Sequence, residues 1–463
     1  MNRRRFLVFG LSPLPQDTDS PCLGPGRRAW QLVKPLLLAG HDIRLITCRP
    51  GRAVTTAAAP TEVDAGLGNR CLRIETNQAR FEDPVWGAAQ VKDFAPDAII
   101  GATIYPSAVA CRIAGELPVW GDAFGHAMAE AQTKAALEHS DYPLDVFWEY
   151  ERTVVDRADR ISTVSQRQAW AVIGELGVRG RLTGRNAGYR FTDVIPCGFD
   201  PAAPLARALG PYQPERDGEF HLLWSGGFNT WTDVDTLFRG IELAMNDAPT
   251  LRFIATGGAI AGHDEQTYGR FQALVEQSPH RDRYRLAGWV EPHERDTLLA
   301  RAQLAINIDR PSWEAELGSR NRIVDWLANG LPFLTTPLCE LAAETVRRGF
   351  AFAFPPGDPE ALAGCLRAAI AQPLRLDQMS AAASAAADDW GFIRTTAPLL
   401  EWCAAPARAP DGANRAVLDL PSARSGLPLR RIAIALRRHL RNDGVRGTLR
   451  WTLAKIRQRL PRR

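Results

Sequence analysis

The sequence predicts an α/β fold with two doubly wound, Rossmann-like domains. Short apolar runs alternate with helical patterns along most of the chain, which is typical of a parallel sheet covered by helices on both faces. The order strand, glycine loop, helix occurs near the N-terminus and restarts near residue 221. A chain of 463 residues is long enough for two such domains and an extension. From the pattern alone, two unrelated Rossmann-like domains remain an alternative.

The first domain, placed at residues 1–198, is predicted to open with a buried strand. Three arginines and a short apolar run at the N-terminus superficially resemble a signal peptide, but prolines at 13 and 15 soon break the run. We therefore expect a strand there, followed by a glycine loop and a helix that ends at Gly40. The predicted strands of this domain are RFLVFG (5–10), DIRLIT (42–47), DAIIG (97–101) and PVWG (118–121).

The second domain, placed at residues 199–404, is predicted to repeat this pattern after a boundary near 194–201. Its first strand runs into a glycine loop, and a helix follows at about 233–245. The predicted strands are HLLWSGG (221–227), LRFIATGG (251–258), RLAG (285–288), LAINID (304–309), LPFLTT (331–336) and FAFAF (350–354). The segment from Trp390 to Cys403 is expected to return to the first domain.

Residues 405–463 are predicted to form a linker and a basic amphipathic tail. Residues 430–463 contain 12 Lys and Arg and one acid, whereas the whole chain has a net charge of +4, so the body is acidic. Leu449, Leu453, Ile456 and Leu460 form an apolar stripe, which is typical of a helix on an anionic membrane surface. A tail that binds nothing in particular is the plainer alternative. Nucleic acid is not expected as a partner, because the body is acidic.

The composition is that of an ordinary soluble protein, with 45% hydrophobic and 23% charged residues. No apolar run approaches the roughly 18 residues that a transmembrane helix needs. The eight cysteines are scattered without a CxxC motif, so neither a metal site nor a disulfide framework is expected. These observations favour a cytoplasmic location.

The segment at 312–336 carries the most specific chemistry. Glu316 and Gly318 precede two arginines, Arg320 and Arg322, and a helical stretch that contains Asp325. A helix N-terminus and two arginines suit a diphosphate, and carboxylates accept hydroxyl protons from sugars and ribose. The alternative is an ordinary amphipathic helix with solvated charges.

The same segment resembles the donor-site signature of retaining GT-B glycosyltransferases of glycosyltransferase family 4. That signature is Glu, seven residues, Glu, and then Ala-x-Gly-x-Pro; here Glu316 is followed by eight residues, Asp325, and the sequence ANGLP at 328–332. The IPCGFD sequence at 195–200 resembles the interdomain segment of the family. The resemblance implies the GT-B architecture, in which two Rossmann-like domains face a cleft, and a nucleotide-sugar donor bound to the second domain.

The resemblance implies that Glu316 contacts the donor sugar and that Asp325 holds the ribose. Family members carry an Arg and a Lys after the first strand of the second domain, but this chain has neither there, so we infer that Arg320 and Arg322 bind phosphate, with Arg310 as a further candidate. Because cations and helix ends can stabilise the leaving diphosphate, no metal and no cofactor is expected. The predicted donor-binding residues are Gly24, Gly26, Gly226, Gly227, Asn229, Glu316, Gly318, Ser319, Arg320, Asn321, Arg322 and Asp325.

On the acceptor side, Asp122 and His126 follow a predicted strand, where ligands of α/β proteins bind. Relatives often have His or Asp in this loop near the reacting carbon, and the sequence does not choose between the two. With Glu316 they form the predicted catalytic set. In a retaining transfer a phosphate oxygen can serve as the base, so paired carboxylates of the glycosidase type are not required.

The sequence therefore predicts a metal-independent hexosyltransferase on the inner face of the plasma membrane. It would use a nucleotide sugar and a glycan or lipid-linked acceptor, in cell-surface polysaccharide synthesis. Two alternatives remain open: a sugar-nucleotide epimerase, and a catalytically silent GT-B protein that binds a glycan or another transferase.

Overall fold

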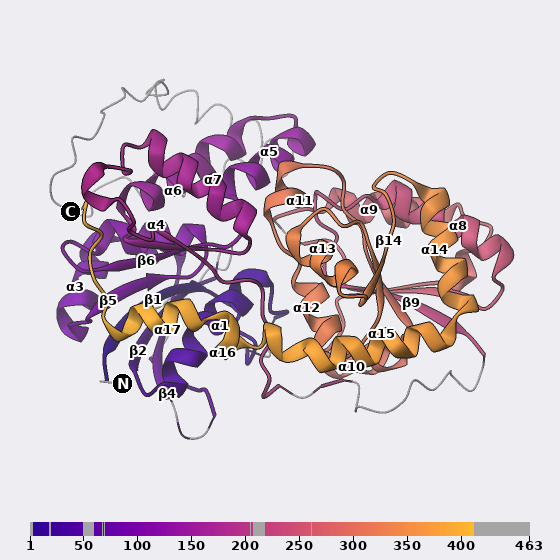
Figure 1. Ribbon diagram of the computed structural model, residues 1–463, viewed down its shortest axis with the longest axis horizontal. Helices are drawn as coiled ribbons and strands as arrows, with labels where there is room; N and C mark the ends of the chain where they lie inside the picture. Colours follow the sequence, from indigo (N-terminus) through magenta and orange to yellow (C-terminus); the bar gives the residue numbers. More distant parts are fainter. Residues whose placement is uncertain are drawn as a thin grey trace, which may run out of the picture.

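The computed structural model describes residues 3–411 except 18–19, 50–59, 67, 69, 204, 207–217 and 261. Within these residues the chain forms two α/β domains side by side, each built on its own sheet (Figure 1). The predicted pair of doubly wound domains is confirmed. The basic tail predicted at 430–463, and most of the linker before it, lie outside the described residues.

The N-terminal sheet has the strand order β3-β4-β2-β1-β5-β6-β7-β8, and its pairs are parallel except that β3 runs antiparallel to β4. Most of the strands are apolar runs whose residues are largely buried, as expected for a sheet covered on both faces, whereas β3 and β4 at one edge are polar and partly exposed. Their bounds are β1 Arg5–Leu11, β2 Asp42–Cys48, β3 Thr61–Asp64, β4 Arg70–Thr76, β5 Ala98–Gly101, β6 Val119–Ala123, β7 Arg160–Thr163 and β8 Thr192–Val194.

Helix α1 covers one face of this sheet, while α4, α6 and α7 contribute to the core on the other. Several of these helices have a side-chain N-cap. At the start of α7, for example, Ser165 accepts a hydrogen bond from the backbone of Gln168. The helices of this domain are α1 Gly24–Leu38, α2 Gln78–Phe81, α3 Pro84–Phe94, α4 Ile104–Ile113, α5 Ala127–Glu138, α6 Tyr142–Arg157 and α7 Gln166–Val178.

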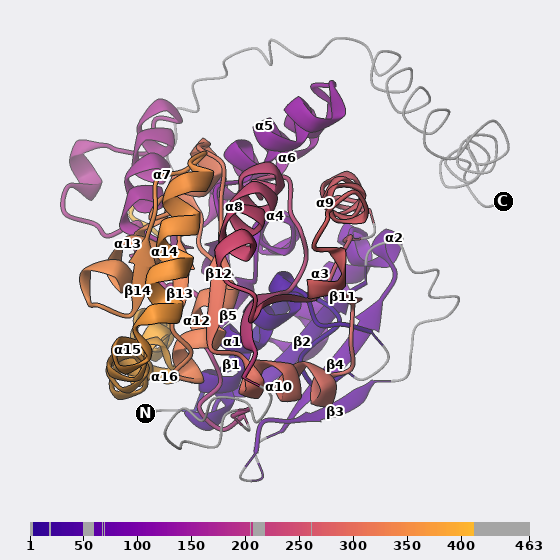
Figure 2. The same ribbon diagram turned by 90° about the vertical axis from the view of Figure 1, so that its right-hand side faces the viewer.

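The C-terminal sheet is fully parallel in the described residues, with the order β11-β10-β9-β12-β13-β14. Helices α8 and α14 pack against each other on one face (Figure 2), and α10, α12 and α13 cover the other. The strands are β9 Phe220–Ser225, β10 Leu251–Thr256, β11 Tyr284–Gly288, β12 Leu304–Asn307, β13 Phe333–Thr335 and β14 Ala351–Ala353. The helices are α8 Val234–Asp247, α9 Gln266–Glu276, α10 Pro292–Arg301, α11 Trp313–Leu317, α12 Asn321–Ala328, α13 Glu340–Arg347, α14 Pro359–Ala371 and α15 Pro373–Ala386.

The chain then returns to the N-terminal domain through α16 (Phe392–Thr395) and α17 (Ala397–Ala404), which lie beside α1 in Figure 1. Leu399 and Trp402 belong to the core of the N-terminal domain, and the Trp402 ring lies 5.5 Å from that of Trp120. Further on, Asp411 pairs with the buried Arg181. The packing therefore assigns residues from about 392 to the N-terminal domain, whereas the division predicted from the sequence kept them in the second domain up to 404.

In each sheet the first strand of the domain lies between strands that are added in opposite directions, so the strand order reverses there. Glycines follow this strand in both domains, at the start of α1 and in the loop after β9. In the C-terminal sheet β9 is flanked by β10 and β12, and in the N-terminal sheet β1 is flanked by β2 and β5. Ligands of doubly wound proteins bind beyond the carboxyl ends of the strands at this position. We therefore expect ligands to bind at the loops after β1, β9 and β12.

No helix among the described residues has the length and apolar character needed to cross a bilayer.

Candidate donor and acceptor sites

The segment at 312–336 forms two helices rather than one. Ser312 caps α11 by accepting a hydrogen bond from the Ala315 backbone, and α12 begins at Asn321. Gly318 lies between them, and a Cβ there would come within 2.8 Å of a carboxylate oxygen of Glu314. The glycine therefore allows the chain to pass close to this acid, and the N-terminus of α12 follows directly.

Arg320, the residue before α12, is enclosed by two carboxylates. Its Nε donates to Asp309 at 3.0 Å, and its Nη2 donates to Glu314 at 2.8 Å. The side chain is only 4% exposed, and its guanidinium also lies over the Trp231 ring. Although burial lowers it, the two acids raise the pKa of Arg320 above its ordinary value. Arg320 thus connects the loop after β12 to α11 through these two acids. This structural role differs from the phosphate contact predicted from the sequence.

Arg322, in the first turn of α12, has a different environment. Its Nη2 donates to the Gly227 carbonyl at 2.8 Å, and its guanidinium lies 3.8 Å above the Trp224 ring. The Nη1 is buried and has no hydrogen-bond partner, and none of the described residues forms an ion pair with this side chain. Burial lowers its pKa to about 9. A guanidinium that has a buried, unpartnered nitrogen and no ion pair is costly unless an anion reaches it.

The glycine loop after β9 lies against this arginine. Gly226 has φ +90°, a left-handed conformation that favours glycine, and its carbonyl accepts a hydrogen bond from Trp224. A Cβ on Gly227 would lie 2.4 Å from Ile260, so this glycine is required by packing. Asn229 is half-buried and makes backbone hydrogen bonds with Thr232 in the same loop.

Two further buried hydroxyls lie in the loop before α12 and in the loop after β9. The Ser319 hydroxyl is buried and lies beside the Cys197 thiol, and it makes no other hydrogen bond among the described residues. The Thr230 hydroxyl, in the loop after β9, is buried without a hydrogen-bond partner. No side chain caps α12, and its first turn contains no acid. Unsatisfied donors and a free helix N-terminus are the features of an anion site.

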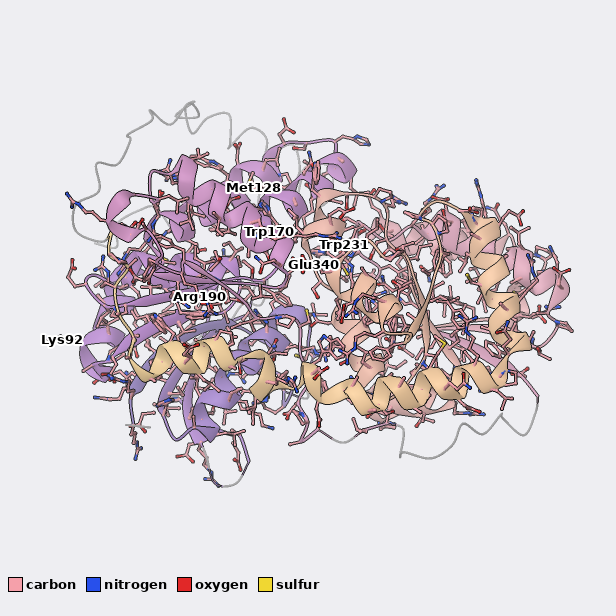
Figure 3. The ribbon with its side chains drawn as sticks, in the orientation of Figure 1. Lys92, Met128, Trp170, Arg190, Trp231 and Glu340 are labelled. Carbon is pink, nitrogen blue, oxygen red and sulfur yellow. The ribbon has the colours of Figure 1, made fainter. Side chains whose placement is uncertain are left out.

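The two domains meet through ion pairs at the predicted donor acids. Arg27 of α1 pairs with both carboxylate oxygens of Asp325, and Arg167 of α7 pairs with Glu316. Glu340 accepts hydrogen bonds from the backbone at the N-terminus of α7 and lies at the domain junction (Figure 3). The acids that the resemblance places at the donor sugar and ribose are therefore bound here by arginines of the other domain.

The glycines of the N-terminal domain have different surroundings. A Cβ on Gly24 would lie 3.2 Å from the Asn321 side chain, so the start of α1 faces the start of α12. A Cβ on Gly26 would lie 1.8 Å from the Pro13 carbonyl, which makes Gly26 a packing requirement. The structure thus brings Gly24, Asn321, Arg322 and Gly226 to the region of the α12 N-terminus.

Asp122 lies inside β6 rather than in the loop after it. It is fully buried, and its carboxylate accepts hydrogen bonds from Arg28, Ser162 and the backbone of Thr103. All of these partners belong to the N-terminal domain. We therefore correct its predicted catalytic role: Asp122 joins α1 to the sheet and does not face an acceptor.

His126 is the N-cap of α5 and remains mostly buried. Its Nδ1 accepts from the Ala129 backbone at 3.3 Å, and its Nε2 lies 3.1 Å from Glu175 of α7. Glu151 of α6 completes the group, and burial together with the nearby Glu175 raises the pKa of Glu151 above its ordinary value. Sequence reasoning missed the two glutamates because they come from separate helices. It also missed Arg27, although this arginine directly follows the Gly24–Gly26 loop.

Comparison with known proteins agrees with this architecture. Residues 24–183 match a family model described as glycosyl transferase 4-like domain, and residues 219–372 match one described as glycosyl transferases group 1. With one match in each domain, the chain belongs to the GT-B glycosyltransferases. No match was found among curated protein sequences.

Solved structures show the same fold at low identity. Sucrose-phosphate synthase from Thermosynechococcus elongatus has a TM-score of 0.63 and 16% identity, covering 87% of this chain and 98% of that one. Trehalose-6-phosphate synthase from E. coli, bound with UDP-2-fluoro glucose, has a TM-score of 0.62 and 13% identity, covering 86% and 98%. HepE from Anabaena, in complex with UDP and glucose, has a TM-score of 0.60 and 16% identity, covering 87% and 100%.

Proposed function

We propose that this glycosyltransferase moves a hexosyl group from a nucleoside-diphosphate sugar to a glycan or lipid-linked acceptor with retention. The observation that carries the proposal is Arg322, a guanidinium without a counter-ion at the N-terminus of α12 and beside the Gly226–Gly227 loop. A leaving diphosphate develops negative charge, and fixed donors at this position stabilise it. Similar folds with UDP sugars, and a trehalose-6-phosphate synthase described for transfer with retention, support the donor class and the stereochemistry.

The interdomain arginines belong to this proposal. Asp325 and Glu316 can accept hydroxyl protons from ribose and sugar only if Arg27 and Arg167 move or share them. These ion pairs are partly exposed, with side-chain exposures between 28% and 39%, so each contributes little to stability. Donor binding is therefore expected to exchange these pairs for contacts with the nucleotide sugar.

The ion pairs Arg27–Asp325 and Arg167–Glu316 also favour a second candidate function. If Arg27 and Arg167 hold the two acids permanently, the chain is a catalytically silent GT-B protein that binds a glycan or another transferase. The missing Arg/Lys pair after β9 agrees with this alternative.

Incubation with a panel of nucleotides and nucleotide sugars distinguishes the two. We expect UDP or GDP, or their sugars, to raise the melting temperature, because a ligand at 100 times its Kd adds about 2.7 kcal/mol to the free energy of unfolding. Slow hydrolysis of the donor without acceptor should accompany this stabilisation. No thermal shift with any member of the panel would instead support the silent protein.

We further propose that the basic tail holds the enzyme at an anionic membrane, in cell-surface polysaccharide synthesis. Residues 430–463 carry the charge and the apolar stripe that support this, and they lie outside the described residues. Each Lys or Arg near an anionic surface contributes about 1 kcal/mol.

Deletion of 430–463 should abolish co-sedimentation with vesicles that contain anionic lipid and leave the nucleotide thermal shift unchanged. Neutral vesicles serve as the control. Equal sedimentation of the full-length and truncated proteins would reject the membrane role but not the transferase.

A further inference from the structure

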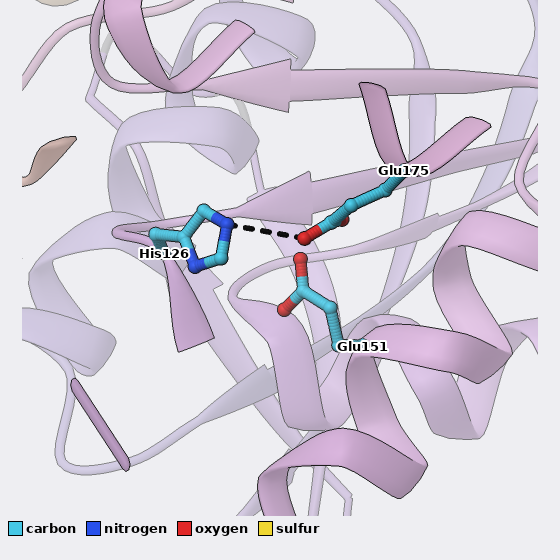
Figure 4. A group of neighbouring side chains, drawn as sticks. All are labelled: His126, Glu151 and Glu175. Atoms are coloured by element: carbon cyan, nitrogen blue, oxygen red, sulfur yellow. Dashed lines mark ion pairs between the residues drawn. The ribbon is translucent and has the colours of Figure 1, made fainter. Parts of the chain in front are cut away.

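Three side chains of types that can ligate a metal converge in the N-terminal domain. His126 begins α5, Glu151 lies in α6 and Glu175 lies in α7, so three helices meet at one point (Figure 4). One ligand atom of each residue lies within 4.8 Å of the other two. Neither the donor site nor the family matches account for this grouping.

Among the described residues, no Lys or Arg forms an ion pair with the carboxylates of this group. Glu151 is 4% exposed, and its Oε2 has no hydrogen-bond partner. The Oε2 of Glu175 is also buried and unpartnered. Within the group, His126 is the partner of Glu175. If both carboxylates are ionised, the largely buried group has excess negative charge beside one imidazole, and a proton or a cation would balance it.

We propose that His126, Glu151 and Glu175 bind a divalent transition-metal ion such as Zn²⁺. One imidazole nitrogen and two carboxylate oxygens form a donor set that zinc accepts, with a water in the remaining position. Bonds of about 2.0–2.2 Å place tetrahedral ligand atoms about 3.5 Å apart, so the side chains need only a small contraction. Binding through Nε2 moves the imidazole proton to Nδ1, and the 3.3 Å bond from the Ala129 backbone is then given up.

The group lies next to the domain junction, so a bound ion would have a structural role there. Helices α5 and α7 both contact α11 of the C-terminal domain. At the start of α7 the Ser165 hydroxyl donates to the Leu317 carbonyl at 3.0 Å. An ion that joins α5, α6 and α7 would fix this wall of the N-terminal domain.

The test uses the full-length protein, freed of any affinity tag and stripped of metal with a chelator. Zn²⁺ is measured by equilibrium dialysis, and Co²⁺ by its visible absorption. We expect one ion per chain and a higher melting temperature with Zn²⁺. Glu151→Gln and Glu175→Gln preserve the side-chain shape and should each weaken Co²⁺ binding by at least about 100-fold. Glu149→Gln, an exposed glutamate on the same helix as Glu151, is the matched control and should bind as the wild type does.

Two outcomes would overturn the proposal. One is wild-type protein that binds no Co²⁺ and shows no thermal shift with Zn²⁺; if Glu151→Gln is then more stable than wild type, a shared proton balances the carboxylates instead. The other is binding that persists equally in both glutamine variants, which would place the ion elsewhere. If either variant fails to fold, His126→Gln with the same Co²⁺ titration decides between these results.

Discussion

Replacing Arg322 with methionine is expected to remove donor binding while leaving the unliganded protein as stable as wild type or more stable. The guanidinium forms no ion pair among the described residues and its Nη1 makes no hydrogen bond, so its contacts with Gly227 and the Trp224 ring offset only part of the cost of burying its charge. A bound diphosphate would supply the missing anion. Loss of one such fixed donor costs about 10²–10³-fold in kcat, or roughly 3–4 kcal/mol of transition-state stabilisation.

The measurement compares wild type and Arg322→Met for the thermal shift with nucleoside diphosphate and for the rate of donor hydrolysis. Arg285→Met is the control, since Arg285 is exposed and pairs with Glu294 at the surface. It should change neither quantity. An Arg322→Met protein with the wild-type thermal shift would show that the diphosphate is bound elsewhere.

Replacing Arg320 with alanine is expected to destabilise the fold rather than weaken donor contact directly. Removal of this cation leaves Asp309 and Glu314 buried without compensation, because both carboxylates are under 10% exposed and both accept from Arg320. Breaking a buried pair by removal of one partner costs about 3–5 kcal/mol. Chemical denaturation measures this loss.

A compensating variant separates loss of charge balance from loss of volume. Arg320→Met combined with Glu314→Gln removes one buried negative charge along with the positive one and should recover part of the lost stability. Arg347→Ala, at an exposed pair with Glu344, should stay within about 0.5 kcal/mol of wild type. Unchanged stability in Arg320→Ala, together with lost nucleotide binding, would restore the phosphate role predicted from the sequence.

The fold could be predicted from the sequence because its signals are local. Each buried strand of the C-terminal sheet is a short apolar run, and the loop after β9 is marked by Gly226 and Gly227. The split of 312–336 into α11 and α12 was missed, although Ser312 and Gly318 both stand at helix boundaries.

The roles of individual site residues could not be predicted to the same degree. Arg320 and Arg322 are two positions apart in the sequence and carry the same charge. Only the structure shows that Asp309 and Glu314 both pair with Arg320. Asp122 stood beside a predicted strand end, but its partner Arg28 is 94 positions away in sequence. Pairing between distant positions depends on packing, which periodicity does not encode.

A crystal structure of the full chain with UDP or GDP would show where the diphosphate binds. We expect the diphosphate oxygens to accept hydrogen bonds from Arg322 Nη1 and from the backbone at the start of α12. We also expect Arg27 to have moved away from Asp325 or to share it with the ribose. A diphosphate bound away from α12, with the arginine–carboxylate pairs intact, would contradict these expectations.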